Sequence, residues 1–229
     1  MAESTSPAHV SLATVFQVRA GRLQVLLWRR AKGPFSGAWA LPGGLLDADE
    51  TLEASIRRHL AAKVDVRELS HLEQLETRAA ARTGLVTTAF LGLVPTGIDP
   101  AVPDDTAWHP VDDLPPAAFD HGSFVLAARD RLRAKLSYTN LGFALAPETC
   151  TISELRDLYA AALGRDLSAT NLQRVLLRRD VLVPTGERRP SGRAGGRPAE
   201  TFRFRSLHLE VTDPFAVLRP RAGSGAGRR

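Results

Sequence analysis

The chain has 229 residues, of which 44% are hydrophobic, with one cysteine and a formal net charge of +5. The single cysteine, Cys150, excludes an intramolecular disulfide and a cysteine-based metal site, and no apolar run is long enough to span a membrane. The length predicts two domains, and the N-terminus has no basic-then-apolar signal pattern, which predicts a cytoplasmic protein.

The first half of the chain mixes predicted strands with two predicted helices. Runs rich in β-forming residues at 10–18 and 23–28 flank a short polar turn, which predicts a β-hairpin. Further strands are predicted at 72–78 and 85–94 around Gly84, and proline-bearing loops at 95–105 and 113–120. Helical spacing over 122–136 predicts the element that closes this half.

Between these strands, residues 44–66 predict an amphipathic helix after a Gly-Gly pair and a polar loop at 45–49. Thr51 is a plausible N-cap for it. Apolar residues recur every four positions and form one face of the helix, whereas positions 59, 62 and 63 converge on another face. The apolar face is Leu52, Ile56, Leu60 and Val64.

This segment resembles the Nudix box, in which Gly44, Glu50, Arg58 and Leu60 match at the right spacing. The flanks are also similar to Nudix domains: the run from Trp39 to Gly44, and a strand that ends in Trp28, Arg29 and Arg30. The resemblance implies an α/β/α sandwich, which fits the order of elements over 9–136.

The chain departs from the box at the positions that carry its chemistry. His59, Ala62 and Lys63 stand where the family has three metal-binding glutamates, and Asp65 replaces its closing glycine. Glutamates there would hold Mg²⁺, which prefers oxygen ligands and would activate water against a pyrophosphate. Alanine offers no ligand, lysine adds a positive charge, and imidazole is a poor Mg²⁺ ligand. We therefore predict no metal site and no hydrolase.

A pocket on this domain is expected to bind phosphates through arginines and through backbone groups near the Gly-Gly pair. For each arginine a plain surface charge is the alternative, and for Arg58 the alternative is an ion pair with Glu50 that holds the loop on the helix. The candidates are Arg29, Arg30, Gly43, Gly44, Glu50 and Arg58, with Arg78 and Arg82 as weaker ones.

Residues 151–214 predict a winged helix-turn-helix after a junction at 137–150. Thr151 and Glu154 form a capping box that starts a helix, and Gly164 ends it. A second helix over 169–179, a strand over 181–184, an Arg/Gly/Pro-rich loop over 187–198 and a returning strand over 201–205 complete the pattern. Residues 215–229 predict a disordered tail.

Charge and side-chain pattern favour double-stranded DNA as the partner of this second half. Residues 147–229 carry 15 arginines against 9 acidic residues, whereas residues 1–146 carry 15 basic and 16 acidic residues. Asn171, Arg174 and Arg178 form a polar stripe on the second helix, where a recognition helix reads base edges. Arginines of the wing can enter a narrow minor groove.

The alternatives are a solvated helix face and a plain linker. The predicted DNA-binding residues are Thr151, Ser168, Thr170, Asn171, Gln173, Arg174, Arg178, Arg193 and Arg197, and the wing also carries Arg188 and Arg189.

The two halves together resemble the NrtR family, the Nudix-related transcriptional regulators of bacterial NAD metabolism. The resemblance includes the degenerate box and three short segments: Ala118-Phe119-Asp120-His121, the run from Lys135 to Thr139, and Gly196-Arg-Pro-Ala199. It implies a homodimer, a palindromic operator, and ADP-ribose or a related nucleotide as effector, with no cofactor. Two readings stay open beside this repressor: an active Nudix pyrophosphatase, and an inactive domain that only dimerises a DNA-binding module.

Overall fold

A β-hairpin opens the fold, as the sequence predicts. In the computed structural model, which describes residues 8–80, 85–190 and 198–216, β1 (His9–Arg19) pairs antiparallel with β2 (Arg22–Arg29). The two turn residues, Ala20 and Gly21, both have positive φ, at 48° and 72°. Turns of this kind match the right-handed twist of the flanking strands.

The hairpin is the centre of a mixed sheet with the order β3-β2-β1-β6-β5. Strand β4 adds to β1 and β7 adds to β2, and only the pairing of β1 with β6 is parallel among the pairs of this sheet in the described part of the chain. The short strands β3, β4 and β7 were not predicted. The remaining strands are β3 (Trp39–Ala40), β4 (Gly43–Leu45), β5 (His71–Ala80), β6 (Leu85–Leu93) and β7 (Thr106–Pro110).

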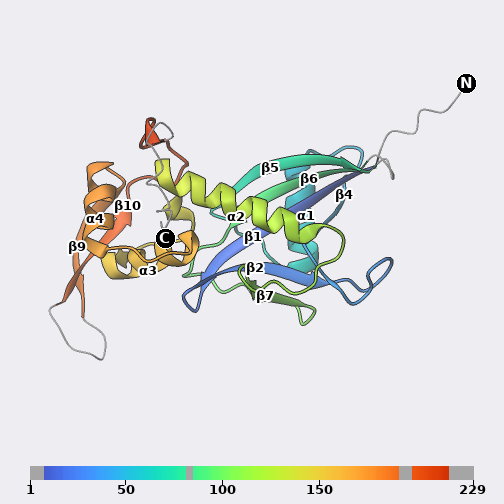
Figure 1. Cartoon of the computed structure of the whole chain (residues 1–229), viewed down its shortest axis with the longest axis horizontal. Helices are drawn as coiled ribbons and strands as arrows, with labels where there is room; N and C mark the ends of the chain where they lie inside the picture. Colours follow the sequence, from blue (N-terminus) through green and yellow to red (C-terminus); the bar gives the residue numbers. More distant parts are fainter. Residues whose placement is uncertain (1–7, 81–84, 191–197, 217–229) are drawn as a thin grey trace, which may run out of the picture.

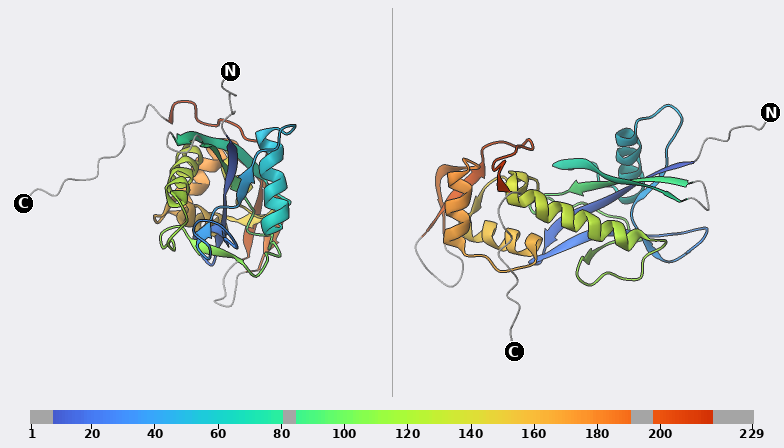
Figure 2. Two further views of the ribbon diagram at one scale, coloured as in Figure 1. Left: turned by 90° about the vertical axis from the view of Figure 1, so that its right-hand side faces the viewer. Right: turned by 45° about the horizontal axis from the view of Figure 1, so that its top comes forward.

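One helix covers each face of this sheet, so the expected α/β/α sandwich is confirmed. Figure 2 shows α1 (Leu52–Val64) and α2 (His121–Tyr138) on opposite sides of the strands. Successive residues of β1 pack on opposite faces of the sheet, because the side chains of a strand point alternately to its two faces. Ala13 and Val15 pack in the cluster that contains the buried face of α1, and Leu12 and Phe16 pack in the cluster that contains α2.

The box helix begins where its sequence predicts. The Thr51 hydroxyl accepts a hydrogen bond from the Ala54 amide at 3.1 Å, which confirms it as the N-cap. Ile56, Leu60 and Val64 are fully buried. Asp65 takes the left-handed conformation, φ 51°, in which the family's box has glycine.

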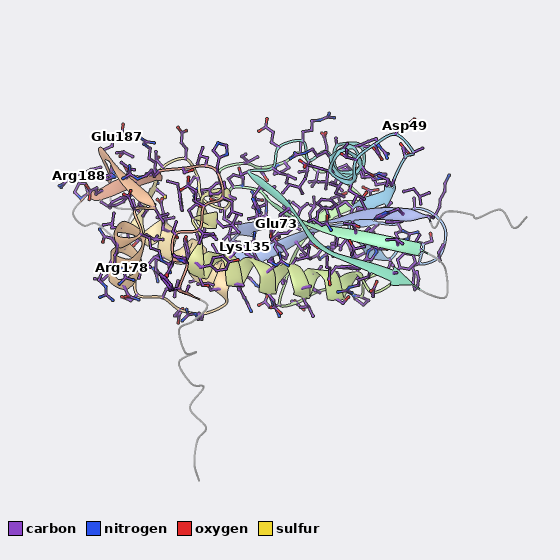
Figure 3. All side chains as sticks on the ribbon, turned by 90° about the horizontal axis from the view of Figure 1, so that it is seen from above. Asp49, Glu73, Lys135, Arg178, Glu187 and Arg188 are labelled. Carbon is purple, nitrogen blue, oxygen red and sulfur yellow. The ribbon has the colours of Figure 1, made fainter. Side chains whose placement is uncertain are left out.

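A nearly buried ion pair fastens α2 to the sheet. Glu73 of β5 pairs with Lys135 of α2, and both side chains are only 14% exposed; Figure 3 shows the two side by side at the middle of the molecule. Burial alone would raise the pKa of Glu73, but hydrogen bonds from His71 and Lys135 outweigh it and hold the pKa below its ordinary value.

The second half of the chain folds as the predicted winged helix. Thr151 and Glu154 form the capping box of α3, and Gly164 ends the helix with φ 67°. The Ser168 hydroxyl caps α4. A three-stranded sheet of order β8-β10-β9 forms the wing beside the helices (Figure 1). The elements are β8 (Cys150–Thr151), α3 (Ile152–Leu163), α4 (Ala169–Arg178), β9 (Leu182–Arg189) and β10 (Ala199–Phe204).

The extent of the wing corrects one expectation. The loop was predicted over 187–198, but β9 continues through Arg189 because Arg188 and Arg189 pair with Glu200 and Ala199 of β10. Of the arginines assigned to the loop, Arg193 and Arg197 lie outside the described residues, as does most of the predicted tail, from residue 217.

The junction joins the two halves into one hydrophobic core. Leu141 and Phe143, in the short 3-10 helix η1 (Leu141–Ala144), belong to the same buried cluster as residues of β1, α2, α3 and α4. Asn140 is 2% exposed, donates to the His208 carbonyl at 2.8 Å and accepts from the Glu210 amide at 2.8 Å. The junction is therefore packed on both sides.

In the described part of the chain, no helix combines the length and the apolarity needed to cross a lipid bilayer.

Candidate functional site

The Gly-Gly pair is a point of very close backbone approach. A Cβ on Gly43 would lie 2.1 Å from the Ser11 carbonyl oxygen of β1, and a Cβ on Gly44 would lie 2.5 Å from the imidazole of His59. Because the clash at Gly43 is with backbone atoms and its φ is 156°, that position requires glycine, whereas a side chain at Gly44 would have to displace the His59 ring. As a result β4 pairs with β1 and also contacts the box helix through His59 and Lys63.

Glu50 and Arg58 form a clamp that holds the loop before α1. The Arg58 Nε donates to Glu50 Oε2 at 3.0 Å, and its Nη2 lies 3.0 Å from Asp47 Oδ2. The Arg58 hydrogen bond, then one from the Asp47 amide, lower the pKa of Glu50 to about 2. The ion pair named above as the alternative role of Arg58 is therefore present.

The three positions that carry glutamates in the family form no metal site here. The His59 Nε2 lies 2.9 Å from the Leu45 carbonyl oxygen, Ala62 is exposed, and Lys63 donates to the Gly43 carbonyl. Across the described residues no group of three or more His, Cys, Asp or Glu side chains could hold a metal ion. A magnesium ion, which takes oxygen ligands, does not fit this donor set.

The two arginines at the end of β2 lie on aromatic rings. The Arg29 guanidinium lies 4.8 Å from the Trp39 ring centroid, and that of Arg30 lies 5.0 Å from Phe119. Phe35 packs edge-on against Phe119 with centroids 4.8 Å apart. Neither arginine forms an ion pair with another described residue, so both are available to an anion.

The aromatic partners of these arginines were not predicted as site residues. Trp39 and Phe119 appear in the sequence only within the segments that carry the family resemblance. An arginine over an aromatic ring is held in place without losing its charge. Those two segments were therefore the signal that could have identified them.

Arg78, one of the weaker candidates, braces α2 against the sheet. Its Nη1 donates to the Ser123 hydroxyl at 2.6 Å and lies 3.1 Å from Asp120 Oδ2, and its guanidinium lies 3.9 Å from the Phe124 ring centroid. A further bond to Glu76 raises its pKa above the ordinary value. The other weak candidate, Arg82, lies outside the described residues.

His121 links the start of α2 to the strand-loop segment before the Gly-Gly pair. Its Nδ1 accepts a hydrogen bond from the Leu41 amide at 3.0 Å, and the residue is 6% exposed. Burial lowers the pKa of His121 to about 4 from an ordinary 6.5. The ring is therefore neutral at physiological pH, which lets Nδ1 act as an acceptor.

We predict that His121 makes the fold acid-sensitive. The pKa of His121 is lower in the folded protein than in the unfolded chain, so the unfolded chain takes up a proton at a higher pH. The contribution of His121 to the free energy of unfolding is therefore fully present above pH 6.5 and is lost as the pH falls toward about 4. His121→Asn keeps an acceptor for Leu41 but cannot be protonated. Urea unfolding at pH 7, 5.5 and 4 should show that the wild type loses free energy of unfolding more steeply than His121→Asn as the pH falls. Equal losses in the two proteins would contradict the role given to His121.

The second helix of the winged domain presents the predicted polar stripe to solvent. Thr170, Asn171, Arg174 and Arg178 are exposed and Gln173 is half-buried, whereas Leu172 and Leu176 are buried. The Arg174 Nη2 donates to Asn171 Oδ1 at 2.8 Å, so the two side chains are held together. Figure 3 shows Arg178 of α4 and Arg188 of the wing at the same end of the molecule.

Other predicted DNA-binding residues have structural tasks. Thr151 is 7% exposed and its hydroxyl is engaged in the capping box. The Ser168 hydroxyl accepts from the Asn171 amide at 3.3 Å. Arg189, also a wing arginine, bonds Glu154 at 2.6 Å and so holds the wing against α3.

Comparison with known proteins matches both halves of the chain. The model of the NUDIX domain matches residues 8–128, and that of the NrtR DNA-binding winged helix domain matches residues 142–204. A transcriptional repressor of Acinetobacter baylyi, described as ADPR responsive, is 30% identical over 232 residues, which are 94% of this chain and 89% of the relative.

Solved structures agree over the same length. Shewanella oneidensis NrtR is 34% identical with a TM-score of 0.73, and the similarity covers 86% of this chain and 93% of that one. The same protein in complex with a 27mer DNA gives a TM-score of 0.71 at 32% identity, covering 85% and 92%. Since both modules match in the same order and the similarity covers most of the molecule, the chain belongs to the NrtR family of Nudix-related transcriptional regulators.

Proposed function

We propose that this protein is a transcriptional repressor of NAD-metabolism genes that releases or binds its operator in response to ADP-ribose or a closely related nucleotide. The observation that carries the proposal is a group of cationic side chains, Arg29, Arg30 and Lys63, with no glutamate at positions 59, 62 or 63. It is joined through one continuous core to a winged helix whose second helix carries an exposed polar stripe. The ADPR-responsive repressor of Acinetobacter baylyi supports the choice of ligand.

The effector is proposed to lie at the end of β2, over β4 and the start of α1. Its phosphates would meet Arg30 and the backbone near Gly44, and Arg29 would add a second positive charge beside them. Glu50 and Arg58 shape the loop, since they already bond to each other. Arg78 would act indirectly, because its bonds reach the start of α2.

The DNA is proposed to lie along α4 and the wing, with the protein as a homodimer on a palindromic operator. In helix-turn-helix proteins the N-terminal part of the recognition helix contacts base edges, and a two-fold dimer matches two half-sites. Asn171 and Arg174 lie in that part of α4. The complex of Shewanella oneidensis NrtR with a 27mer DNA supports double-stranded DNA as the partner.

The test is the response of operator binding to ligand. Genomic footprinting would supply the bound sites, and fluorescence anisotropy would then measure affinity for such a site at fixed salt, since salt alone shifts protein–DNA affinity. We expect sites before NAD-biosynthesis genes and a change in affinity as ADP-ribose is added. If saturating ADP-ribose leaves the affinity for the operator unchanged, the Nudix domain serves only to dimerise the DNA-binding module.

We also predict no hydrolysis of ADP-ribose above background with Mg²⁺. The three carboxylates that would hold the ion are absent, and metal-activated water is the nucleophile of such reactions. The measurement is release of AMP and ribose 5-phosphate by the pure protein, followed chromatographically. Glu50→Gln is the control: turnover that disappears in this variant would establish an active pyrophosphatase.

A further inference from the structure

Lys63 is fixed at the place where the family's box would gather a metal. Its ammonium donates to the Gly43 carbonyl and lies 4.7 Å from the centroid of the Trp28 ring. The Trp28 indole is in turn held by its own hydrogen bond, from Nε1 to the Leu41 carbonyl at 3.2 Å. An ammonium held by a carbonyl on one side and an aromatic face on another has little freedom to move.

The charge around Lys63 is not balanced by acids. Burial, then the nearby cations Arg30 and Arg58, lower the pKa of Lys63. Arg58 is compensated by Asp47 and Glu50. Lys63 and Arg30, by contrast, take part in no ion pair with another described residue. Such a pair of cations attracts a polyanion.

The groups around Lys63 leave no place for a divalent metal ion. The His59 ring fills the space above Gly44, and its Nε2 is engaged with the Leu45 carbonyl. The Gly43 carbonyl oxygen, which could otherwise face a cation in the site, already accepts from Lys63. A dication placed there would meet a fixed positive charge and no carboxylate from positions 59, 62 or 63.

We propose that the Lys63 ammonium takes the place of the divalent metal, so that a diphosphate ligand binds here through Lys63 and Arg30 without Mg²⁺. An ammonium has three donors; one goes to Gly43 and the others can reach phosphate oxygens. Unlike a metal, it supplies no activated water, so the ligand is bound but not cleaved. The identity of the ligand as ADP-ribose rests on the function proposed above.

Calorimetry of the full-length protein with ADP-ribose, in EDTA and in Mg²⁺, tests the proposal. We expect the same affinity in both buffers, within about twofold. Lys63→Met keeps the apolar stem on Trp28 and removes the charge, and it should weaken binding in EDTA by about tenfold to a hundredfold, the usual effect of losing a hydrogen bond to a charged group. Lys63→Arg, which keeps the charge, should retain most of the affinity.

Arg57→Met is the matched control, because it removes a positive charge from the same helix. Arg57 is exposed and paired with Glu53 on α1, so binding should change less than twofold. Thermal unfolding of each variant would show whether Lys63→Met alters the fold instead. If it does, the comparison of EDTA with Mg²⁺ in the wild type still decides the question.

The outcomes separate this inference from the proposed function. Binding of ADP-ribose only in Mg²⁺, or wild-type affinity of a folded Lys63→Met in EDTA, would overturn the metal replacement and leave the repressor standing. Inorganic pyrophosphate is the second probe. If it binds in EDTA in a Lys63-dependent manner while ADP-ribose does not bind, the cationic site is supported and the ligand assignment is wrong. If neither binds, both proposals are overturned.

Discussion

Gly142→Ala is expected to remove most of the coupling between effector and operator, which in allosteric proteins amounts to about 5- to 150-fold in affinity. Gly142 lies in η1, and a Cβ there would be 2.3 Å from the Tyr159 hydroxyl oxygen and 2.8 Å from its Cζ. Tyr159 belongs to α3 and is 3% exposed. The added methyl group therefore forces the buried Tyr159 ring to move, and with it the contact between η1 and α3.

The measurement is the affinity for ADP-ribose with and without saturating operator, because binding linkage is reciprocal. The wild type should show two different affinities, and Gly142→Ala should show nearly equal ones. Gly122→Ala is the matched control, since a Cβ at Gly122 meets nothing within 4 Å. Wild-type coupling in a folded Gly142→Ala protein would mean that the signal does not pass through η1.

Arg174→Ala is expected to weaken operator binding by about 1–3 kcal/mol and to relax sequence preference, as for an arginine that contacts a base. Arg174 is exposed on the recognition stripe, and its bond to Asn171 holds both side chains ready for the groove. Anisotropy with the operator and with random DNA at one salt concentration measures both effects.

The comparison of the two DNAs decides what Arg174 contacts. Equal losses on operator and random DNA would make it a phosphate contact, because phosphates carry no sequence information. Arg57→Ala removes the same charge from α1, far from the winged helix, and should leave both affinities nearly unchanged. A similar loss in that variant would point to net charge as the cause.

Regular elements could be predicted from the sequence because their patterns are long. The apolar repeat of α1, the capping box at Thr151 and the hairpin turn at Gly21 each combine several residues in one signal. Strands β3, β4, β7 and β8 have two to five residues. Such segments carry no periodicity and exist only because a neighbouring strand offers backbone partners.

The sequence shows which metal-binding residues the site lacks, but it does not show which contacts the remaining residues make. The missing glutamates follow directly from aligning the box, and the pairing of Arg58 with Glu50 follows from their charges. That Lys63 would bond the carbonyl of Gly43, 20 residues earlier in the chain, could not be inferred, because it depends on how β4 lies against α1. The bracing role of Arg78 likewise depends on the position of α2.

Helix α2 spans the molecule between the proposed effector site and the winged helix. At one end, His121 holds Leu41 and Arg78 holds Asp120. At the other, the Ser137 carbonyl accepts from Arg179, the residue that ends the recognition helix, at 2.6 Å. Figure 1 shows this helix running from the sheet to the winged domain without a break.

In the proposed repressor, α2 would act as a rigid arm that transmits a tilt from one end to the other. Its 18 residues give a length of about 27 Å at the rise of an α-helix, so a tilt of about 4° at the effector end moves the far end by about 2 Å. In a two-fold dimer the two arms swing in opposite senses, so the span between the recognition helices changes by up to twice that displacement. A ligand that rotates α2 only slightly can thus change the spacing of the two recognition helices so that it no longer matches the spacing of the two half-sites.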